Sequence, residues 1–123
     1  DAKDGTSSTL FLGEFNYQHP TYVWTTASNS CSVNPALNGV VRWGSARWGG
    51  GYAGLAVGGT GGVFNGYSGN VTTDRETWRS DHPGGAHFAM ADGTVRFIST
   101  NINAALLRGL ATRNGREVIT LGE

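Results

Sequence analysis

The clearest pattern of apolar and polar positions lies in the last third of the chain. Residues 86–91 and 94–99 are two short runs rich in apolar side chains, and Asp92 and Gly93 lie between them. An Asp-Gly pair between two such runs is a strong signal for a tight β-hairpin turn. The pattern therefore predicts two antiparallel strands joined at these two residues.

A turn of two residues also fixes which side chains lie opposite each other. On the face predicted to be buried, it pairs Phe88 with Phe97 and Met90 with Val95. On the opposite face, it pairs His87 with Ile98 and Ala89 with Arg96. Each such cross-strand pair contributes roughly 0.2–1 kcal/mol to stability. The aromatic pair and the Met–Val pair indicate the face that would pack on a core.

The residues after the hairpin predict one short helix, from about residue 102 to residue 112. Asn101 or Asn103 can cap its first turn, because an Asn side chain accepts hydrogen bonds from the exposed backbone N–H groups. Three apolar residues fall on one stripe of this helix: Ile102, Leu106 and Leu110. Such a stripe is typical of a helix that packs on a sheet.

The remaining segments predict more strands and one long loop. Residues 9–15, 21–26 and 40–43 are rich in aliphatic, β-branched or aromatic side chains, and residues 117–121 predict a final strand. Almost half of residues 49–69 are glycine, which predicts a long surface loop because glycine-rich backbone is costly to order. Together these elements favour the α+β class, mainly antiparallel β.

The composition agrees with a single small domain over residues 1–123. The chain has 20 Gly together with 4 Trp, 4 Tyr and 5 Phe. Abundant glycine and aromatic residues with few strong helix formers are typical of a loop-rich β or α+β protein. A chain of this size can bury one core.

The charge balance and the hydropathy pattern exclude several classes of protein. The formal net charge is zero, so the basic surface expected of a nucleic-acid-binding protein is missing. No run of roughly 18 apolar residues is present to span a bilayer, and no signal peptide begins at Asp1. Cys31 is the single cysteine, so no disulfide can form within the chain.

Two segments of the sequence resemble one bacterial family. Residues 4–14 and residues 78–119 carry the resemblance, and its most specific part is the spacing from His82 to Asp92-Gly93. Nine residues, 83–91, separate that histidine from the Asp-Gly pair. This spacing resembles the prepilin-type, processing-associated H-X9-DG domain family of bacterial type IV pilin-like and pseudopilin proteins.

The resemblance implies a pilin-like head that acts as a structural subunit at the cell surface or in a secretion assembly, and not as an enzyme. Such heads usually follow a short leader and a long apolar spine helix, which this chain lacks. We therefore expect partner proteins, either copies of the chain or a chain supplying the missing N-terminal part, which would cover an exposed sheet edge. An accessory module that docks on a larger extracytoplasmic complex or on surface carbohydrate is the alternative. Either function places the chain outside the cytoplasm.

Two interpretations compete for the motif residues His82, Asp92 and Gly93. Turn chemistry alone explains an Asp before a Gly in a hairpin. A structural hydrogen bond that fixes the approach to the hairpin explains the histidine. An enzyme using His82 and Asp92 remains a third hypothesis, but the sequence has no Gly-x-Ser-x-Gly elbow and no phosphate-binding loop. We therefore predict no catalytic residues.

The sequence shows no convincing metal site. Zinc needs three or four ligands, and the available ones are scattered without a paired motif: His19, Cys31, His82 and His87. Calcium prefers carboxylates and loop carbonyls, and three acidic residues cluster before the hairpin: Asp74, Glu76 and Asp81. A solvated acidic loop, interleaved with Arg75 and Arg79, explains this cluster as well. We expect no cofactor, with calcium as the alternative.

A short repeat of Arg-Trp pairs is the last candidate feature. Arg42-Trp43 and Arg47-Trp48 are flanked by glycine. Trp and Arg are enriched at protein interfaces, so these four residues are candidates for an interface. Ordinary core or cation–π contacts explain these Arg-Trp pairs equally well, and stacking of the Trp side chains on a sugar ring is a further hypothesis.

Overall fold

The computed structural model describes residues 3–15, 18–25, 34–43 and 57–115. In this part of the chain there are five strands, β1 (Leu10–Gly13), β2 (Gln18–Val23), β3 (Val41–Trp43), β4 (Gly85–Met90) and β5 (Val95–Ser99). The α-helices are α1 (Val71–Asp74) and α2 (Ala104–Leu110).

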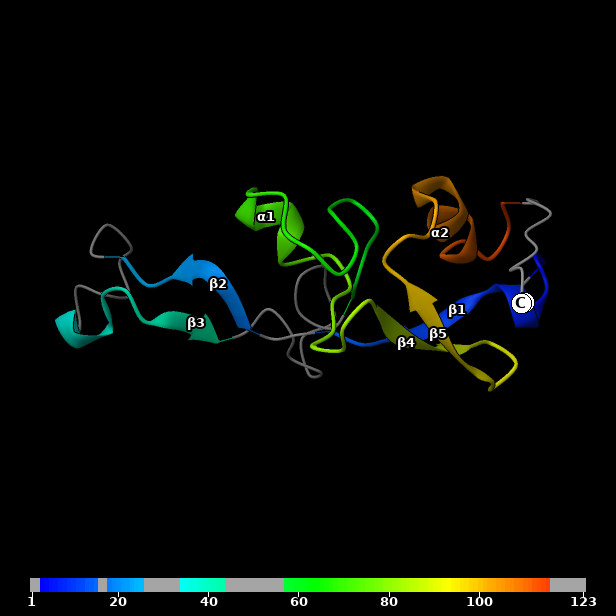
Figure 1. The fold of residues 1–123 in the computed structure, drawn as a ribbon, viewed down its shortest axis with the longest axis horizontal. Coiled ribbons are helices and arrows are strands. Elements are labelled where there is room, and N and C mark those ends of the chain that lie inside the picture. Colours follow the sequence, from blue (N-terminus) through cyan, green and yellow to red (C-terminus); the bar gives the residue numbers. More distant parts are fainter. Residues whose placement is uncertain (1–2, 16–17, 26–33, 44–56, 116–123) are drawn as a thin grey trace.

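The strands form two small antiparallel sheets (Figure 1). One sheet has the order β1-β4-β5, so a strand from the start of the chain lies beside the C-terminal hairpin. The other sheet contains β2 and β3 and extends to one side of the molecule. This arrangement confirms an α+β fold with antiparallel sheets.

The hairpin forms at the predicted place, but its register differs by one residue from the prediction. His87 lies opposite Phe97 and Phe88 lies opposite Arg96, so the two phenylalanines are on opposite faces. The reason is the turn, which has three residues and not two. The Met90 N–H donates to the Thr94 carbonyl at 2.8 Å, and the residues between them form the turn. Gly93, with φ of 86°, takes the left-handed position that such a turn requires. All four predicted pairs are therefore wrong.

The core lies between the β1-β4-β5 sheet and α2. Six apolar residues are fully buried there: Ala86, Phe88, Met90, Ile98, Leu107 and Leu110. They come from β4, β5 and α2, and the helix lies over one face of the sheet (Figure 1). Fully burying a side chain as large as that of Phe88 contributes about 1.5–3 kcal/mol.

The helices differ from the sequence prediction in number and in detail. Asn103 is the N-cap of α2, and its side-chain oxygen accepts the Ala105 N–H at 2.8 Å. The helix is shorter than predicted, and Leu107 is buried in place of Leu106. The prediction of one short helix was also wrong, because Asn70 caps a second one, α1.

The other strands agree with the prediction in place but not in length. β1 is shorter than residues 9–15, and β2 begins earlier than residue 21. The predicted final strand at 117–121 and residues 49–56 of the glycine-rich segment lie outside the described residues. The rest of that segment, residues 57–69, is described and consists mainly of turns and bends, with the Gly59 N–H donating to the Glu76 carbonyl at 2.7 Å. In the described part of the chain, no helix has the length and hydropathy needed to cross a membrane.

Candidate functional site on the open face of the sheet

The face of the β1-β4-β5 sheet opposite the core is open and apolar. An irregularity in β1 between Leu10 and Leu12 inserts an extra residue into the strand pairing. Leu10 packs at the core, whereas Phe11 is 72% exposed and Leu12 is 64% exposed. On β5, Val95 is 67% exposed and Phe97 is 49% exposed. The open face therefore carries large apolar side chains from both outer strands.

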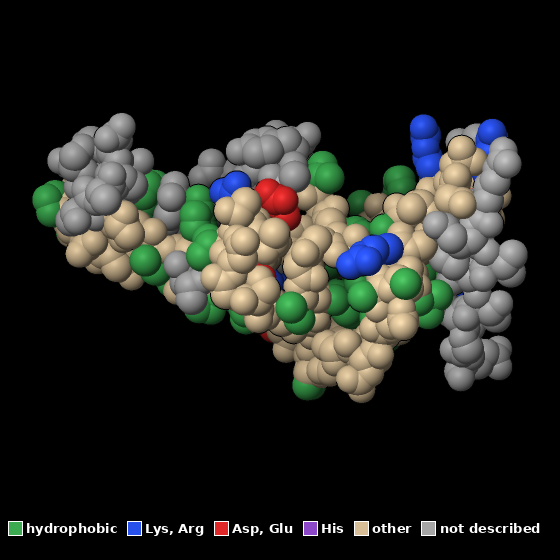
Figure 2. Space-filling view, turned by 90° about the horizontal axis from the view of Figure 1, so that it is seen from above, with side chains coloured by type: hydrophobic (Ala, Val, Ile, Leu, Met, Phe, Trp, Pro, Cys, Tyr) green, Lys and Arg blue, Asp and Glu red, His purple; other side chains and the backbone are tan. Residues whose placement is uncertain are grey.

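Figure 2 shows the molecule from the side of the helices. In this view, acidic and basic side chains are few, and apolar side chains are spread among polar groups and backbone. Charged residues make up 15% of the whole chain, which agrees with this sparse pattern. A surface with few charged side chains exerts little long-range electrostatic attraction or repulsion on other molecules.

A polar cluster lies at one end of the open face, where Glu14 follows β1. The Glu14 N–H donates to the His87 carbonyl at 3.2 Å, and the His87 N–H donates to the Glu14 carboxylate at 2.7 Å. The His87 ring nitrogen Nδ1 is 3.5 Å from the same carboxylate. The pairing of β1 with β4 thus fixes both residues of the cluster.

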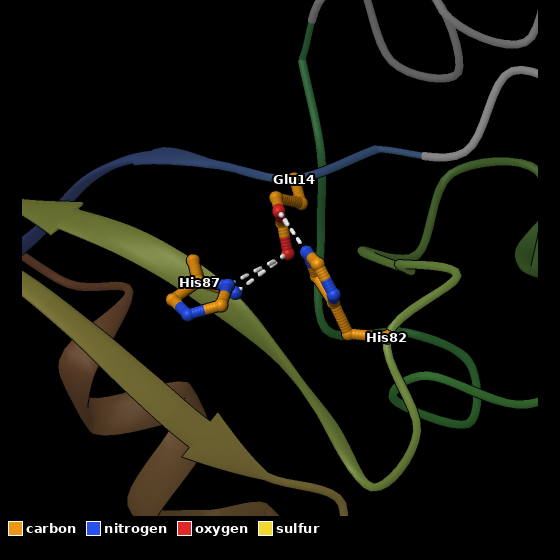
Figure 3. Close-up of side chains that lie close together, drawn as sticks. All are labelled: Glu14, His82 and His87. Carbon is orange, nitrogen blue, oxygen red and sulfur yellow. Dashed lines mark hydrogen bonds and ion pairs between the residues drawn. The ribbon is translucent and has the colours of Figure 1, made fainter.

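His82 completes this cluster from the loop before β4 (Figure 3). Its Nε2 lies 3.2 Å from Glu14 Oε1, and its ring contacts the ring of His87 edge-on with centroids 5.0 Å apart. The His87 ring in turn contacts Phe97, again at 5.0 Å. The cluster is therefore continuous with the apolar part of the open face. The structure thus places Glu14 beside His82, and the structural hydrogen bond suggested for this histidine stays a prediction.

A half-buried amide, that of Asn65, supports the loop that carries His82. The Asn65 side chain accepts the Ser80 N–H at 2.7 Å and donates to the Gly85 carbonyl at 3.2 Å. The Ser80 hydroxyl oxygen accepts the His82 N–H at 3.0 Å. These bonds hold both ends of the loop, so the imidazole of His82 is directed toward Glu14.

The environment of Glu14 favours its ionised form. Burial raises the pKa of the carboxyl group. Hydrogen bonds from the His87 backbone and the Ser80 side chain, together with the charges that His82 and His87 can carry, outweigh this and lower the pKa below its ordinary value. The cluster therefore presents a carboxylate, whose oxygens accept hydrogen bonds or bind cations.

The cluster also revises the sequence-based assessment of metal ligands. One ligand atom from each of Glu14, His82 and His87 lies within 4.8 Å of the other two, and no other group of three such residues occurs in the described ranges. Two histidines considered from the sequence are thus brought together, and the third member was missed. The only signal for it was that Glu14 lies in the N-terminal segment of the family resemblance.

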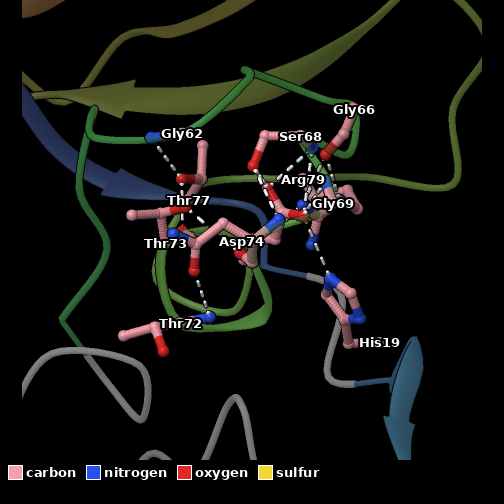
Figure 4. A network of polar contacts seen from close by, with 11 residues as sticks. His19, Gly62, Gly66, Ser68, Gly69, Thr72, Thr73, Asp74, Thr77 and Arg79 are labelled. Atoms are coloured by element: carbon pink, nitrogen blue, oxygen red, sulfur yellow. Dashed lines mark hydrogen bonds and ion pairs between the residues drawn. The ribbon is translucent and has the colours of Figure 1, made fainter.

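The three acidic residues suggested for calcium are not gathered into such a group. Asp74 is fully buried, Glu76 lies 3.9 Å from Arg75, and Asp81 is exposed next to His82. The Asp74 carboxylate is already occupied, because it accepts the N–H groups of Ser68 and Gly69 and the Ser68 hydroxyl (Figure 4). These bonds leave Asp74 as a structural acceptor in the interior.

A network around the buried Asp74 joins β2 to residues 66–79. His19 of β2 places Nε2 3.6 Å from the Asp74 carboxylate, and its ring contacts Tyr67 edge-on. The Arg79 guanidinium donates to the carbonyls of Gly66 and Asp74 and lies 4.1 Å from the centre of the Tyr67 ring. Burial raises the pKa of the Asp74 carboxyl, but its hydrogen bonds outweigh this and lower it. The network therefore has a structural role.

Asp92 and Gly93 form the hairpin turn, as the turn interpretation requires. The Asp92 side chain accepts the Thr94 N–H at 2.9 Å and the Thr94 hydroxyl at 2.7 Å, which lowers its pKa. His82 precedes β4, whereas Asp92 follows it, so the structure does not bring the two residues together.

The Arg-Trp repeat is only partly within the described structure. Arg42 and Trp43 belong to β3, and Trp43 pairs with Gln18 of β2. Arg47 and Trp48 lie outside the described residues. The suggested interface role of all four residues therefore stays a prediction.

Comparison with known protein families supplies the remaining information. Residues 1–105 match the family described as "Protein of unknown function (DUF1559)". The chain belongs to this family. It is a family of prepilin- and pseudopilin-like proteins, which agrees at this level with the resemblance found in the sequence. No curated protein and no solved structure matches the chain significantly.

Proposed function

We propose that this DUF1559 protein is a structural subunit of a pilus-like or pseudopilin assembly outside the cytoplasm, and that it acts without catalysis. Membership of a family of prepilin- and pseudopilin-like proteins supports the proposal. The open apolar face of the β1-β4-β5 sheet is the structural observation that carries it.

The open face has the character of an interaction surface. Phe11 and Leu12 on β1 and Val95 and Phe97 on β5 expose large apolar side chains to water. Transferring such area out of water contributes about 25 cal/mol per Å², so a partner on this face would stabilise the protein. Contiguous exposed apolar area is typical of surfaces that bind other proteins.

The sheet edges favour the same function. In the described part of the chain, β1 and β5 each pair only with β4, so both are edge strands. An edge strand presents backbone N–H and carbonyl groups that can pair with a strand of another molecule. The net charge of zero means that copies of the chain do not repel each other strongly. We therefore assign the open face to a second copy of this chain.

The polar clusters favour a structural role over a catalytic one. A nucleophilic serine needs a base that takes its proton. Ser68 instead donates to the Asp74 carboxylate, which His19 contacts from the other side deep in the interior. The Ser80 side chain hydrogen-bonds to the Glu14 carboxylate and accepts the backbone N–H of His82, so these partners are a carboxylate and a backbone amide rather than an imidazole base. The proposal of a non-enzymatic subunit rests on these arrangements.

Negative-stain microscopy of the concentrated chain tests the proposed function. Fibres or regular lattices are the expected result, because a subunit with an apolar face and two open edges should add further copies. Discrete particles in which the chain is a minor partner of a larger native complex would instead favour an accessory binding module. Single dispersed particles at every concentration, with no such complex, would contradict both functions.

A further inference from the structure

We infer that Glu14, His82 and His87 form a binding site for a divalent transition metal ion of the zinc type. The inference goes beyond the proposed function and does not depend on it. It rests on three side chains, from strand β4, the segment after β1 and the loop before β4, that direct metal-binding atoms at one another (Figure 3).

The donor set selects the class of ion. Two imidazole nitrogens and one carboxylate oxygen suit zinc and its neighbours in the first transition series. Calcium and magnesium prefer oxygen ligands throughout, and two imidazoles would leave them poorly satisfied. The cluster should therefore discriminate strongly between zinc and calcium.

Two distances between possible ligand atoms, each to a different oxygen of Glu14, are close to those of such a site. A tetrahedral zinc ion with bonds of about 2.0–2.1 Å separates its ligand atoms by about 3.3–3.4 Å. Glu14 Oε1 lies 3.2 Å from His82 Nε2, and Glu14 Oε2 lies 3.5 Å from His87 Nδ1. Only modest side-chain rotation is needed to direct all three donors at one ion, because no pair of ligand atoms is more than 4.8 Å apart.

The supporting contacts hold the ligands in place before an ion arrives. The Glu14 N–H donates to the His87 carbonyl at 3.2 Å, and the His87 N–H donates to the Glu14 carboxylate at 2.7 Å, so both residues are held in place. The Ser80 side chain bonds to the Glu14 carboxylate, and its oxygen accepts the His82 N–H. Such outer contacts orient metal ligands, and removing them typically lowers affinity about 10–100-fold.

The site is also reachable from solvent. The side chains of His82, His87 and Glu14 are 55%, 43% and 34% exposed. Three protein ligands leave one position of a tetrahedral ion for water or for a ligand from another molecule. An ion bound here would therefore lie at the end of the open face, beside Phe97.

Calorimetric titration of the chain with Zn²⁺ and with Ca²⁺ tests the inference. We expect one Zn²⁺ per chain, no comparable Ca²⁺ binding, and a loss of zinc affinity of at least about 10-fold in His82→Ala and His87→Ala. Asp81→Asn is the matched control, because it removes a neighbouring negative charge without removing a ligand, and it should bind like the original chain. Circular dichroism of each variant shows whether it is folded.

Absorption spectroscopy with Co²⁺ provides a second test, which uses the original chain and so does not depend on whether a variant folds. Co²⁺ added to the original chain should give the visible absorption of a tetrahedral nitrogen and oxygen site, and equimolar Zn²⁺ should abolish it. Equal zinc affinity in the original chain and in a folded His82→Ala variant would overturn the inference. Absence of one-to-one Zn²⁺ binding in the original chain would overturn it as well. Neither result would affect the fibres expected of the structural subunit.

Discussion

The Glu14 carboxylate accepts the backbone N–H of His87 at 2.7 Å, although the two residues are 73 positions apart in the sequence. This bond ties the segment after β1 to the middle of β4. It also places the carboxylate within 3.2 Å of His82. One acidic side chain thus joins the N-terminal segment, the loop before β4 and the C-terminal hairpin.

Replacing this carboxylate should destabilise the fold. Glu14→Gln keeps an acceptor for the His87 N–H but removes the charge that faces His82 and His87, so we expect a loss of about 1–2 kcal/mol in the free energy of unfolding. Glu76→Gln is the matched control, because Glu76 is also 34% exposed and pairs with Arg75 at 3.9 Å. Its loss should stay below about 0.5 kcal/mol. Equal losses in urea denaturation would contradict the role of Glu14.

Acid should destabilise the protein through carboxylates whose pKa is lower in the folded state. The pKa values of Glu14, Asp74 and Asp92 are all lowered below their ordinary values. The folded state therefore binds protons less readily than the unfolded state, so their contribution is present above about pH 4 and is lost as the pH falls further. The free energy of unfolding, measured with denaturant at a series of pH values from about 6 to about 2, should show this decline.

Asp74 should account for a distinct part of that decline. Asp74→Asn places an amide where the carboxylate accepts the N–H groups of Ser68 and Gly69, so we expect a loss of about 2–4 kcal/mol at neutral pH. The variant should also lose less stability than the original chain when the pH falls below about 4. Parallel stability curves for the two proteins would show that Asp74 is not among the groups responsible.

The sequence predicted the hairpin but not its register, and the difference has a physical cause. Asp92 and Gly93 are compatible with a turn of two residues and with a turn of three. The three-residue turn moves Phe97 to the open face, and only the burial of Ala86, Phe88 and Ile98 against α2 distinguishes the two registers. That burial depends on packing between elements, which the local pattern of the hairpin does not contain.

The candidate site was only half visible in the sequence for a similar reason. His82 was recognised as a motif residue, but Glu14, which lies 3.2 Å from its ring, comes from the other end of the chain. The contact requires β1 to pair with β4, with an extra residue near Leu12. Pairings between distant strands cannot be worked out from periodicity alone, because period and propensity describe only neighbouring residues.

Packing across the sheet provides a test of the core. A Cβ atom added to Gly13 would lie 2.4 Å from the ring of Phe88, and that ring is fully buried and has little room to move. Gly13→Ala should therefore lower stability by about 1–3 kcal/mol in thermal or urea unfolding. At Gly61 an added Cβ meets no atom within 4 Å, so Gly61→Ala should be neutral or slightly stabilising. A neutral Gly13→Ala would contradict the described contact of β1 with the core.

The most direct test of the structural-subunit account is sedimentation velocity over a range of concentrations. Leu12→Glu places a charge on the open face, and Val40→Glu places one on an exposed valine just before β3, as a matched control. We predict that the original chain and Val40→Glu associate as concentration rises. The association constant of Leu12→Glu should be at least about 10-fold lower, because burying one charge at the interface costs more than about 1.4 kcal/mol. A stable monomer of the original chain at all concentrations, or equal association of all three proteins, would contradict the account.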